Sequence, residues 1–290
     1  MTDKLLCIYH RNNLDDFAAA WVVGHYFGFK NVEYVAVDYG DKPPFFEGRS
    51  VYIVGFAYFP EHLIPASVTA DGVTIIDHRQ STADIWGRED PEILRESGIS
   101  LCVDTSLSAV GLSWNNFFPG KEMPRLLNVI QNYDLEREQS LFGQQIVAGI
   151  AATQMLKNQD WEYFTKYAAT SAHLHELESE GRGIMNANRV LMDAIIARSC
   201  SIIRVMDYRV PIANIPSEFS AIAGDRLAKN YPFSVTYEDN HIKGFRIYSL
   251  RSSIDGGIDV GVIAKCFGGI GTKHVAAFTS DIANTFDFLR

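Results

Sequence analysis

The first third of the chain alternates short runs of β-branched and aromatic residues with segments of helical periodicity, and this alternation constrains the fold most. The four runs that are long enough to form strands cover residues 5–10, 32–39, 50–56 and 72–78. Residues 14–28 are predicted to form an amphipathic helix. Continuous apolar strands between helices are typical of a parallel sheet that is covered on both faces. The N-terminal part is therefore predicted to be an α/β domain.

The pattern changes twice along the rest of the chain. Residues 140–199 are mainly helical in character. Apolar residues recur there at the spacing of a helix, which predicts a connector helix: Ile184, Ala187, Leu191, Ala194 and Ile195. Strand-like runs return at residues 201–206, 210–215, 233–239 and 244–253, with a hairpin turn predicted at residues 237–241 and a glycine-rich segment near the end. We predict a first domain at residues 1–140, a helical connector at 141–199 and a smaller α/β domain at 200–290.

The composition excludes several classes of protein. A net charge of −9 argues against binding to duplex nucleic acid, because neutralising its phosphates needs a basic face. No run approaches the roughly 20 apolar residues of a membrane helix, and the N-terminus lacks the pattern of a signal peptide. The four cysteines are far apart, so we expect buried free thiols in a cytoplasmic protein.

Polar residues follow the first and fourth strand-like runs, where parallel sheets usually bind ligands. His10, Asp15 and Asp16 lie close together after the first run and offer nitrogen and oxygen ligands to a divalent metal. Alternatively, the two aspartates cap the following helix. Asp77 and His78 after the fourth run are also potential ligands.

Arg79 directly follows these two residues and has two interpretations. Its guanidinium could hold a phosphate oxygen, or it could form an ion pair with Asp77 that closes the strand. Asp134, farther along, could reach the same crevice, or it could belong to a solvated helix end.

The C-terminal part contains a glycine-rich run that could bind an anion. Gly268 and Gly269 would let backbone amides approach a phosphate, and Lys273, His274 and the upstream Arg251 would add positive charge or donors. The alternative is an ordinary glycine turn before an alanine-rich helix.

In this order, the segments resemble the DHH phosphoesterase superfamily, in the branch with a DHHA1 C-terminal domain. The first motif of the most similar branch reads approximately Y-H-x-N-x-x-D-G-x-x-A-A, which YHRNNLDDFAAAW matches except for Asp16 in place of glycine. The likeness covers nearly the whole chain through VDYGDKPP, SVYIVGFAY, VTIIDHRQS, SLSAVGLSWNNFFPG, ELESEGRGIM, RLAKNYPFSV, YSLRSS and DVGVIAKCFGGIG.

This resemblance implies a two-metal site, usually manganese, in a crevice between the domains, where the metals activate water for attack on phosphorus. It implies the metal ligands His10, Asp15, Asp77, His78 and Asp134. It implies substrate contacts in the DHHA1 domain from Arg251, Gly268 and Gly269, to which we add Lys273 and His274.

Several positions depart from the family pattern. Gly55 stands where the second motif has an aspartate that bridges the metals, and Arg79 replaces the second histidine of the DHH triplet. Asn132 stands where this branch usually has an acid, and Thr272 aligns with a histidine that touches substrate. Because lost carboxylates leave the repulsion between two cations less compensated, we expect one manganese ion or none, with Arg79 in the place of a metal.

Two functions are consistent with these features. The first is a divergent metal-dependent phosphoesterase acting on a short oligonucleotide or a small nucleotide phosphodiester, with Asp77, His78 and Arg79 at the catalytic centre. The second is a pseudoenzyme that binds a nucleotide or a protein partner in the interdomain cleft. The expected ligand is a nucleotide or short single-stranded oligonucleotide. A homodimer is a further expectation, because dimers occur in related proteins. A degenerate copy of this kind is typical of a phage or mobile-element gene.

Overall fold

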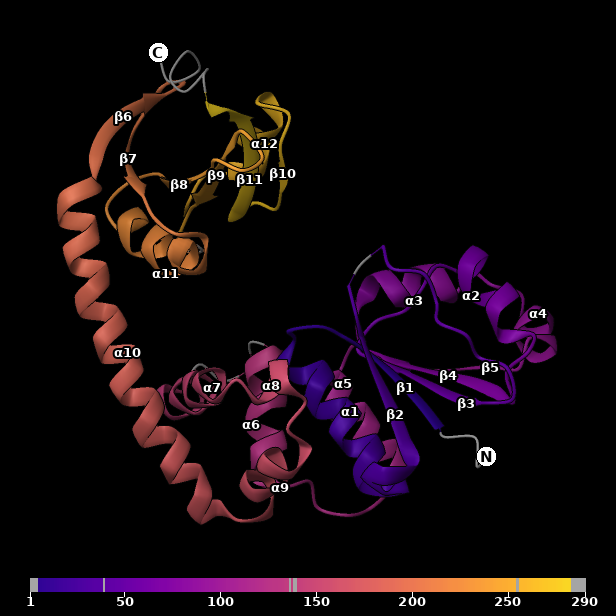
Figure 1. Ribbon diagram of the computed structural model, residues 1–290. Helices are drawn as coiled ribbons and strands as arrows, with labels where there is room; N and C mark the ends of the chain where they lie inside the picture. The colour runs from indigo at the N-terminus through magenta and orange to yellow at the C-terminus, as the bar shows by residue number, and fades with distance from the viewer. Residues whose placement is uncertain (1–4, 39, 136, 138–139, 254–255, 283–290) are drawn as a thin grey trace. The chain divides into compact units, whose positions relative to one another are not determined.

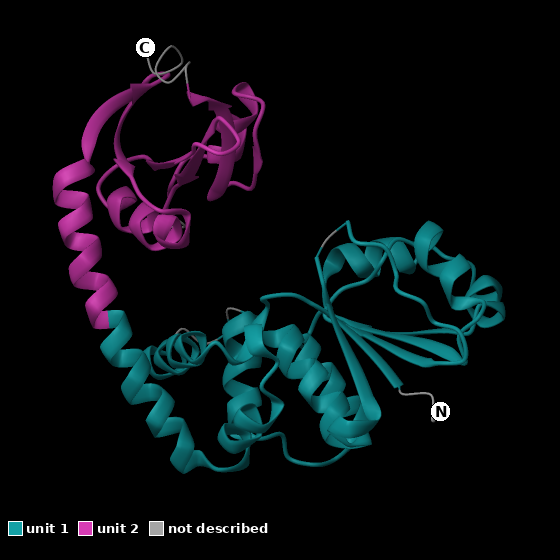
Figure 2. Cartoon of the chain, in the orientation of Figure 1, with its two compact units in different colours: residues 1–185 teal, residues 186–290 magenta. Residues whose placement is uncertain are grey.

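The chain divides into two compact units, residues 1–185 and residues 186–290 (Figure 2). The computed structural model describes residues 5–38, 40–135, 137, 140–253 and 256–282. Most of the segment that was expected to be a separate connector, residues 141–185, groups with the first unit. The three-part division of the chain stays a prediction.

The first unit contains a five-stranded sheet in the order β2-β1-β3-β4-β5, and every neighbouring pair is parallel (Figure 1). The strands are β1 Leu5–His10, β2 Val32–Val37, β3 Ser50–Val54, β4 Gly72–Asp77 and β5 Ile99–Val103. The first four and their parallel arrangement confirm the prediction. The edge strand β5 was not predicted, because its run ISLCV is short and only one of its residues, Ile99, is buried.

Helices cover both faces of this sheet, since alternate side chains along each strand point to opposite faces. Cys7 and Tyr9 face one hydrophobic core, whereas Leu6 and Ile8 face the other. The first core is covered by α1 Leu14–Phe27, α5 Ala109–Phe117, α6 Arg125–Asp134, α7 Leu141–Thr153, α9 Trp161–Ala169 and the start of α10 Ser171–Ser199. The second is covered by α2 Pro60–Ser67, α3 Gln80–Trp86 and α4 Pro91–Glu96 (Figure 1). The short elements η1 Phe29–Asn31 and α8 Met155–Asn158 complete the unit.

Helix α1 is not amphipathic, contrary to the prediction. Residues 15–24 are all buried, because the sheet covers one side of the helix and α5 and α6 cover others. A helix that is buried on every side carries no polar stripe. Its two aspartates are therefore buried and need partners inside the protein.

The second unit contains a mixed sheet in the order β10-β11-β9-β8-β7-β6. Its elements are β6 Ser201–Val205, β7 Tyr208–Asn214, α11 Ser217–Ala228, β8 Ser234–Asn240, β9 Phe245–Arg251, α12 Val260–Cys266, β10 Ile270–Gly271 and β11 Val275–Asp281. Helix α12 packs on one face, and α11 with the end of α10 packs on the other. This arrangement confirms the predicted α/β character of the C-terminal part.

One local prediction for this unit, the position of the hairpin turn, was wrong, and so was the alternative of a helix after the glycine-rich run. Strand β8 continues to Asn240, and the hairpin turn follows it and includes Gly244 at φ 73°. The predicted turn residues instead pair across the hairpin, where Arg246 forms an ion pair with Asp239 and its guanidinium lies over Tyr237. The glycine-rich run precedes a strand, β11, rather than a helix.

The cysteines are free, as expected, but only Cys7 is buried, and Cys266 is exposed. Within the described part of the chain, no helix has the length and apolar character that crossing a membrane requires.

Helices α7 and α10 approach each other closely at two glycines. A Cβ atom at Gly181 would lie 1.7 Å from the carbonyl oxygen of Gln145, and one at Gly149 would lie 2.3 Å from that of Leu177. Gly183, two residues farther along α10, has open space around it.

We predict that Gly181→Ala lowers the free energy of unfolding by about 1–3 kcal/mol, because backbone must move to accept the methyl group. The matched control Gly183→Ala should raise it by roughly 0.5–1 kcal/mol through helix propensity. Urea unfolding of the two variants measures both changes. Equal effects at the two positions would contradict the close approach of α7 and α10.

Candidate metal centre at the carboxyl edge of the sheet

The polar residues singled out in the N-terminal part lie at the carboxyl edge of the parallel sheet. His10 ends β1 and Asp77 ends β4. Helix α1 follows β1 and helix α3 follows β4, and both begin at the same edge. Asp15 and Asp16 lie in the first turn of α1. The chain reverses there, so side chains from distant segments meet.

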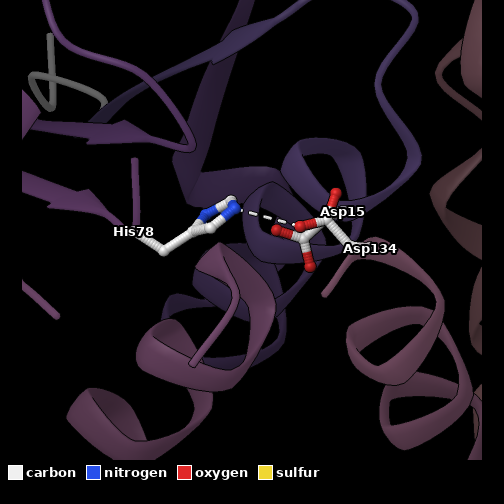
Figure 3. Close-up of side chains that lie close together, drawn as sticks. All are labelled: Asp15, His78 and Asp134. Carbon is white, nitrogen blue, oxygen red and sulfur yellow. Dashed lines mark ion pairs between the residues drawn. The ribbon is translucent and has the colours of Figure 1, made fainter. Parts of the chain in front are cut away.

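Three of the predicted ligands form one cluster. Asp15, His78 and Asp134 point toward one another (Figure 3), and their ligand atoms all lie within 4.8 Å of one another. Asp134 is the last residue of α6, and its Oδ2 lies 3.0 Å from Nε2 of His78. Two carboxylates and an imidazole suit a divalent cation of intermediate hardness, such as manganese or zinc.

Asp15 is fixed by the start of α5. It is buried, and it accepts hydrogen bonds from the Ser108 hydroxyl at 2.6 Å and from the backbone amides of Ala109 at 2.8 Å and Val110 at 3.3 Å. Burial raises the pKa of Asp15 to about 6, with a further contribution from the charge of Asp134, and the Ser108 hydrogen bond opposes this shift. The carboxylate is thus held rigidly with a weakened preference for the charged form.

His78 lies between two carboxylates, those of Asp134 and Asp77. Burial disfavours the imidazolium, but the hydrogen bond to Asp134 and the negative charge of Asp15 outweigh it and raise the pKa of His78. Its Nδ1 atom lies 3.8 Å from Oδ1 of Asp77 and has no hydrogen-bond partner among the described residues. A carboxylate therefore stands on each side of the ring.

Arg79 occupies the neighbouring half of the site. Its Nη1 donates to Oδ1 of Asp77 at 3.0 Å, and its Nη2 donates to Oδ2 of Asp16 at 3.1 Å. Both carboxylates have no solvent exposure, whereas 23% of the Arg79 side chain is exposed. The ion pair with Asp77, one of the two sequence interpretations, is thus present and extends to a second acid. Burial raises the pKa of Asp16, and the Arg79 charge opposes that shift.

Asp16 fills the space above Gly55. A Cβ atom at Gly55 would lie 1.9 Å from Oδ1 of Asp16, and the backbone there has a φ of 77°. Gly55 and Asp16 are two of the positions that depart from the motifs this sequence resembles, and the two changes complement each other. Gly55 has no side chain, and the carboxylate of Asp16 occupies the space that a side chain there would fill.

The five predicted metal ligands therefore do not form one shell. Asp77 uses its oxygens for Arg79, for the Thr82 hydroxyl and for the backbone amide of His78. His10 lies on the Arg79 side, with its Nδ1 3.9 Å from Oδ2 of Asp16, and burial followed by the Arg79 charge lowers the pKa of His10. Among the described residues, Asp15, His78 and Asp134 form the group whose ligand atoms lie within 4.8 Å of one another, and metal binding by the five stays a prediction.

The helix-capping alternative for the aspartates was wrong in detail. Asn13 caps α1 by accepting a hydrogen bond from the amide of Asp16, while Asp15 reaches the start of α5 instead. Asn132 lies two residues before Asp134 on α6, and side chains at that spacing do not share a helix face. It lines a separate cavity of about 220 Å3 with Arg125 and Asn128.

The predicted phosphate-binding residues lie in the second unit. Arg251 ends β9 and its Nη1 lies 3.6 Å from Oδ1 of Asp225 in α11. His274 lies nearby, because its carbonyl accepts a hydrogen bond from the amide of Ser252. Lys273 is exposed beside it, and the neighbouring amide of Thr272 bonds to the carbonyl of Val275.

The two glycines have a structural explanation as well. The amides of Gly268 and Gly269 donate to carbonyls at the end of α12, and Gly268 has a φ of 74°. A Cβ atom at Gly269 would lie 2.2 Å from the carbonyl oxygen of Ala277. Their role in anion binding stays a prediction.

Sequence reasoning missed one contributor to this site and one pairing. Ser108 was not singled out, although it is the N-cap residue of α5 and binds Asp15; a serine at a helix start was the available signal. Asp16 was considered as a ligand or a helix cap, but not as the partner of Gly55, and that pairing could have been suspected because the two changes exchange glycine and aspartate between two motifs.

No protein-family model matches the chain. An uncharacterized protein of Acanthamoeba polyphaga mimivirus is 25% identical in an alignment of 293 positions, which covers 93% of this chain and 66% of that protein. The chain thus spans slightly less than two thirds of the length of this relative.

Solved structures that are similar to this chain include the following two. The pGpG-specific phosphodiesterase PggH from Vibrio cholerae has a TM-score of 0.54 at 13% identity, over 97% of this chain and 94% of that one. An exopolyphosphatase-related protein from Bacteroides fragilis has a TM-score of 0.41 at 13% identity, over 95% and 86% of the two chains. The likeness to the Vibrio structure extends through both units, so this chain shares the fold of that phosphodiesterase.

The contact between Asp16 and Gly55 predicts a non-additive pair of substitutions. Gly55→Ala should cost about 3 kcal/mol of unfolding free energy, because its methyl group meets the Asp16 carboxylate. In an Asp16→Gly background the same change should cost only about 1 kcal/mol, which the positive φ accounts for. A double-mutant cycle by urea unfolding measures the difference. The same cost in both backgrounds would show that the carboxylate does not fill this space.

The Arg79 ion pairs predict a stability loss that depends on pH. Arg79→Met keeps the apolar stem but leaves two buried carboxylates without a cation, which should cost about 3 kcal/mol at pH 7.5. A buried acid whose pKa is raised in the folded protein lowers the stability of the protein as the pH rises above the acid's unfolded pKa of about 4. The stability lost in Arg79→Met should therefore be smaller at pH 5 than at pH 7.5. Thermal unfolding at both values tests this.

The control for that experiment is Arg95→Met, which removes an exposed ion pair with Glu92. It should cost less than about 0.5 kcal/mol at either pH. A loss in Arg79→Met that is independent of pH would mean that this side chain contributes by packing rather than by charge.

Proposed function

We propose that this chain, which has the DHH/DHHA1 fold, is a metal-dependent phosphoesterase that uses one divalent cation and the fixed charge of Arg79. Its substrate would be a short single-stranded oligonucleotide or a small nucleotide phosphodiester. The observation that carries the proposal is the convergence of Asp15, His78 and Asp134 within 4.8 Å, beside a guanidinium that two buried carboxylates hold.

The residues of the cluster fit a cation. Oδ2 of Asp15 accepts only one hydrogen bond among the described residues, so it keeps a lone pair for a metal. His78 presents Nε2 to the same point as Asp134. With Nε2 bound, the ring proton would sit on Nδ1, where Asp77 is the nearest carboxylate at 3.8 Å. Asp77 would thus orient the imidazole, as carboxylates behind metal-bound histidines do.

A manganese ion in this cluster would supply a Lewis acid and activate a water for attack on phosphorus. Asp15 and Asp134 would hold the charge of the ion, and the start of α5 would keep Asp15 in place through Ser108. His78 would complete the set from the end of β4.

Arg79 would balance charge on the substrate. Its guanidinium is partly exposed and is oriented by Asp16 and Asp77, so it needs no reorganisation to face a phosphate oxygen. A guanidinium cannot dissociate as a metal ion can, which makes this half of the site independent of metal concentration. In the second unit, we assign phosphate binding to Arg251, Gly268, Gly269, Lys273 and His274.

The second candidate function is a pseudoenzyme that binds a nucleotide or a protein partner without chemistry. The same ion pairs favour it, because Arg79 pairs with two carboxylates that would otherwise be available to a metal. Manganese binding and hydrolysis separate the two functions.

We predict that calorimetry finds one manganese ion per chain at pH 7.5, and that Asp134→Asn and His78→Ala abolish binding. The surface control Glu92→Gln should bind manganese as the wild type does. With manganese, the wild type should then hydrolyse dinucleotides or short RNAs, and the two site variants should not. No binding at millimolar manganese would reject the hydrolase function and favour the pseudoenzyme.

The affinity for manganese should rise with pH. A proton must leave Asp15, whose pKa is about 6, and His78, whose pKa is raised, before either binds a cation. Below these pKa values, each competing proton should weaken the apparent affinity by about tenfold per pH unit. Titrations at pH 5.5 and 7.5 measure this; equal affinities would mean that other groups hold the ion.

A further inference from the structure

The two carboxylates of the candidate metal centre, Asp15 and Asp134, come from different helices and repel each other when both are ionised (Figure 3). Asp134 is also the last residue of α6, where the helix dipole is unfavourable for an acid. His78 offsets part of this repulsion from the end of β4, since its Nε2 lies 3.0 Å from Oδ2 of Asp134. Other contacts must therefore hold the end of α6 against Asp15 before a cation binds.

Gln131 links the two helices that fix these carboxylates. It lies one turn before Asp134 on α6, at the spacing that places two side chains on one face of a helix. Its Oε1 accepts a hydrogen bond from the backbone amide of Ser108 at 3.4 Å, and the Ser108 hydroxyl donates to Asp15 at 2.6 Å. Ser108 is 0% and Gln131 8% exposed, so water competes little for these contacts. One residue, Ser108, thus connects Asp15 with the face of α6 that carries Asp134.

A recess in α5 receives the Gln131 side chain. A Cβ atom at Gly111 would lie 1.8 Å from Oε1 of Gln131 and 2.8 Å from its Cδ. The side-chain amide therefore fills the space that a larger residue in α5 would occupy. Arg137 makes a second link, because its guanidinium donates to the carbonyl of Ser106 in the loop before α5. The end of α6 is thus tied to the start of α5 by residues that precede and follow Asp134 in the sequence.

Packing alone does not explain a glutamine at this position. The other buried residues of α6 are apolar: Leu126, Leu127 and Ile130. Burying an amide among them costs free energy unless the amide is hydrogen-bonded, so an apolar residue would pack α6 against α5 more favourably. The contact with Ser108, which itself binds Asp15, accounts for a polar side chain here.

We propose that Gln131 is a positioning residue that sets the separation of Asp15 and Asp134 for one divalent cation. The proposal rests on the metal-dependent function proposed above. Gln131 acts through Ser108 on Asp15 and through α6 on Asp134. Without it, the two carboxylates would relax apart, and a cation would first have to bring them together, which lowers its affinity. Residues that orient metal ligands in this way contribute roughly 10–100-fold to metal affinity.

Two substitutions remove the Gln131 contact in different ways, and calorimetry measures the manganese affinity of each variant. Gln131→Ala deletes the side chain. Gly111→Ala displaces it, because the new methyl group takes the place of Oε1. Each should weaken manganese binding by at least about tenfold. The double variant should bind no more weakly than the weaker of the two single variants, because both substitutions act on one contact.

Gly111→Ala also separates positioning from stability. Its methyl group meets the far end of a flexible side chain, and alanine favours a helix over glycine, so the free energy of unfolding should change little. The visible absorption of bound cobalt(II) depends on the number and arrangement of its ligands, and it should change in both single variants. The matched control is Gly181→Ala, whose methyl group meets backbone between α7 and α10. It should lower stability but keep the wild-type manganese affinity and cobalt absorption.

The outcomes keep the positioning role and the proposed function apart. Wild-type affinity or an unchanged cobalt absorption in Gln131→Ala and Gly111→Ala overturns the positioning role and leaves the metal site intact. An equal loss of affinity in Gly181→Ala overturns it too, because the effect then follows general destabilisation. Additive losses in the double variant mean that the two positions act separately, which also overturns it. A wild type that binds no manganese rejects the proposed function and the positioning role with it.

Discussion

The bridge from Asp16 through Arg79 to Asp77 is the interaction on which the site depends. Two carboxylates without solvent exposure lie at the carboxyl edge of a parallel sheet, and each would be strongly destabilising if it were ionised and alone. A single guanidinium satisfies both, since its planar fork offers separate donors to two acceptors. Arg79 begins α3 and Asp77 ends β4, so the ion pairs also join strand, turn and helix at this edge.

This bridge divides the site into two halves with different chemistry. On one side, both buried carboxylates already pair with a cation of the protein, Arg79. On the other, Asp15, His78 and Asp134 converge with two carboxylates for one imidazole and leave room for a cation.

Much of the fold could be predicted because its signals are local. Strands β1 to β4 are apolar runs, and each ends at a polar residue or is followed directly by a polar residue or a glycine. The errors arose where tertiary packing decided the outcome. Helix α1 is buried on all sides by α5 and α6, which lie far from it in the sequence. Strand β8 extends through Asp239 because a cross-strand arginine, Arg246, pairs with it.

The sequence by itself determined the strands, the edge at which the polar residues gather and the residue types that are available there. It also showed the exchange of glycine and aspartate between positions 16 and 55. Only the tertiary structure decided which groups meet: that Asp16 fills the space above Gly55, that Asp77 binds Arg79, and that Asp15 is held by the start of α5. The physical reason is that strand formation depends on neighbours along the chain, whereas the pairing of buried charges depends on neighbours in space.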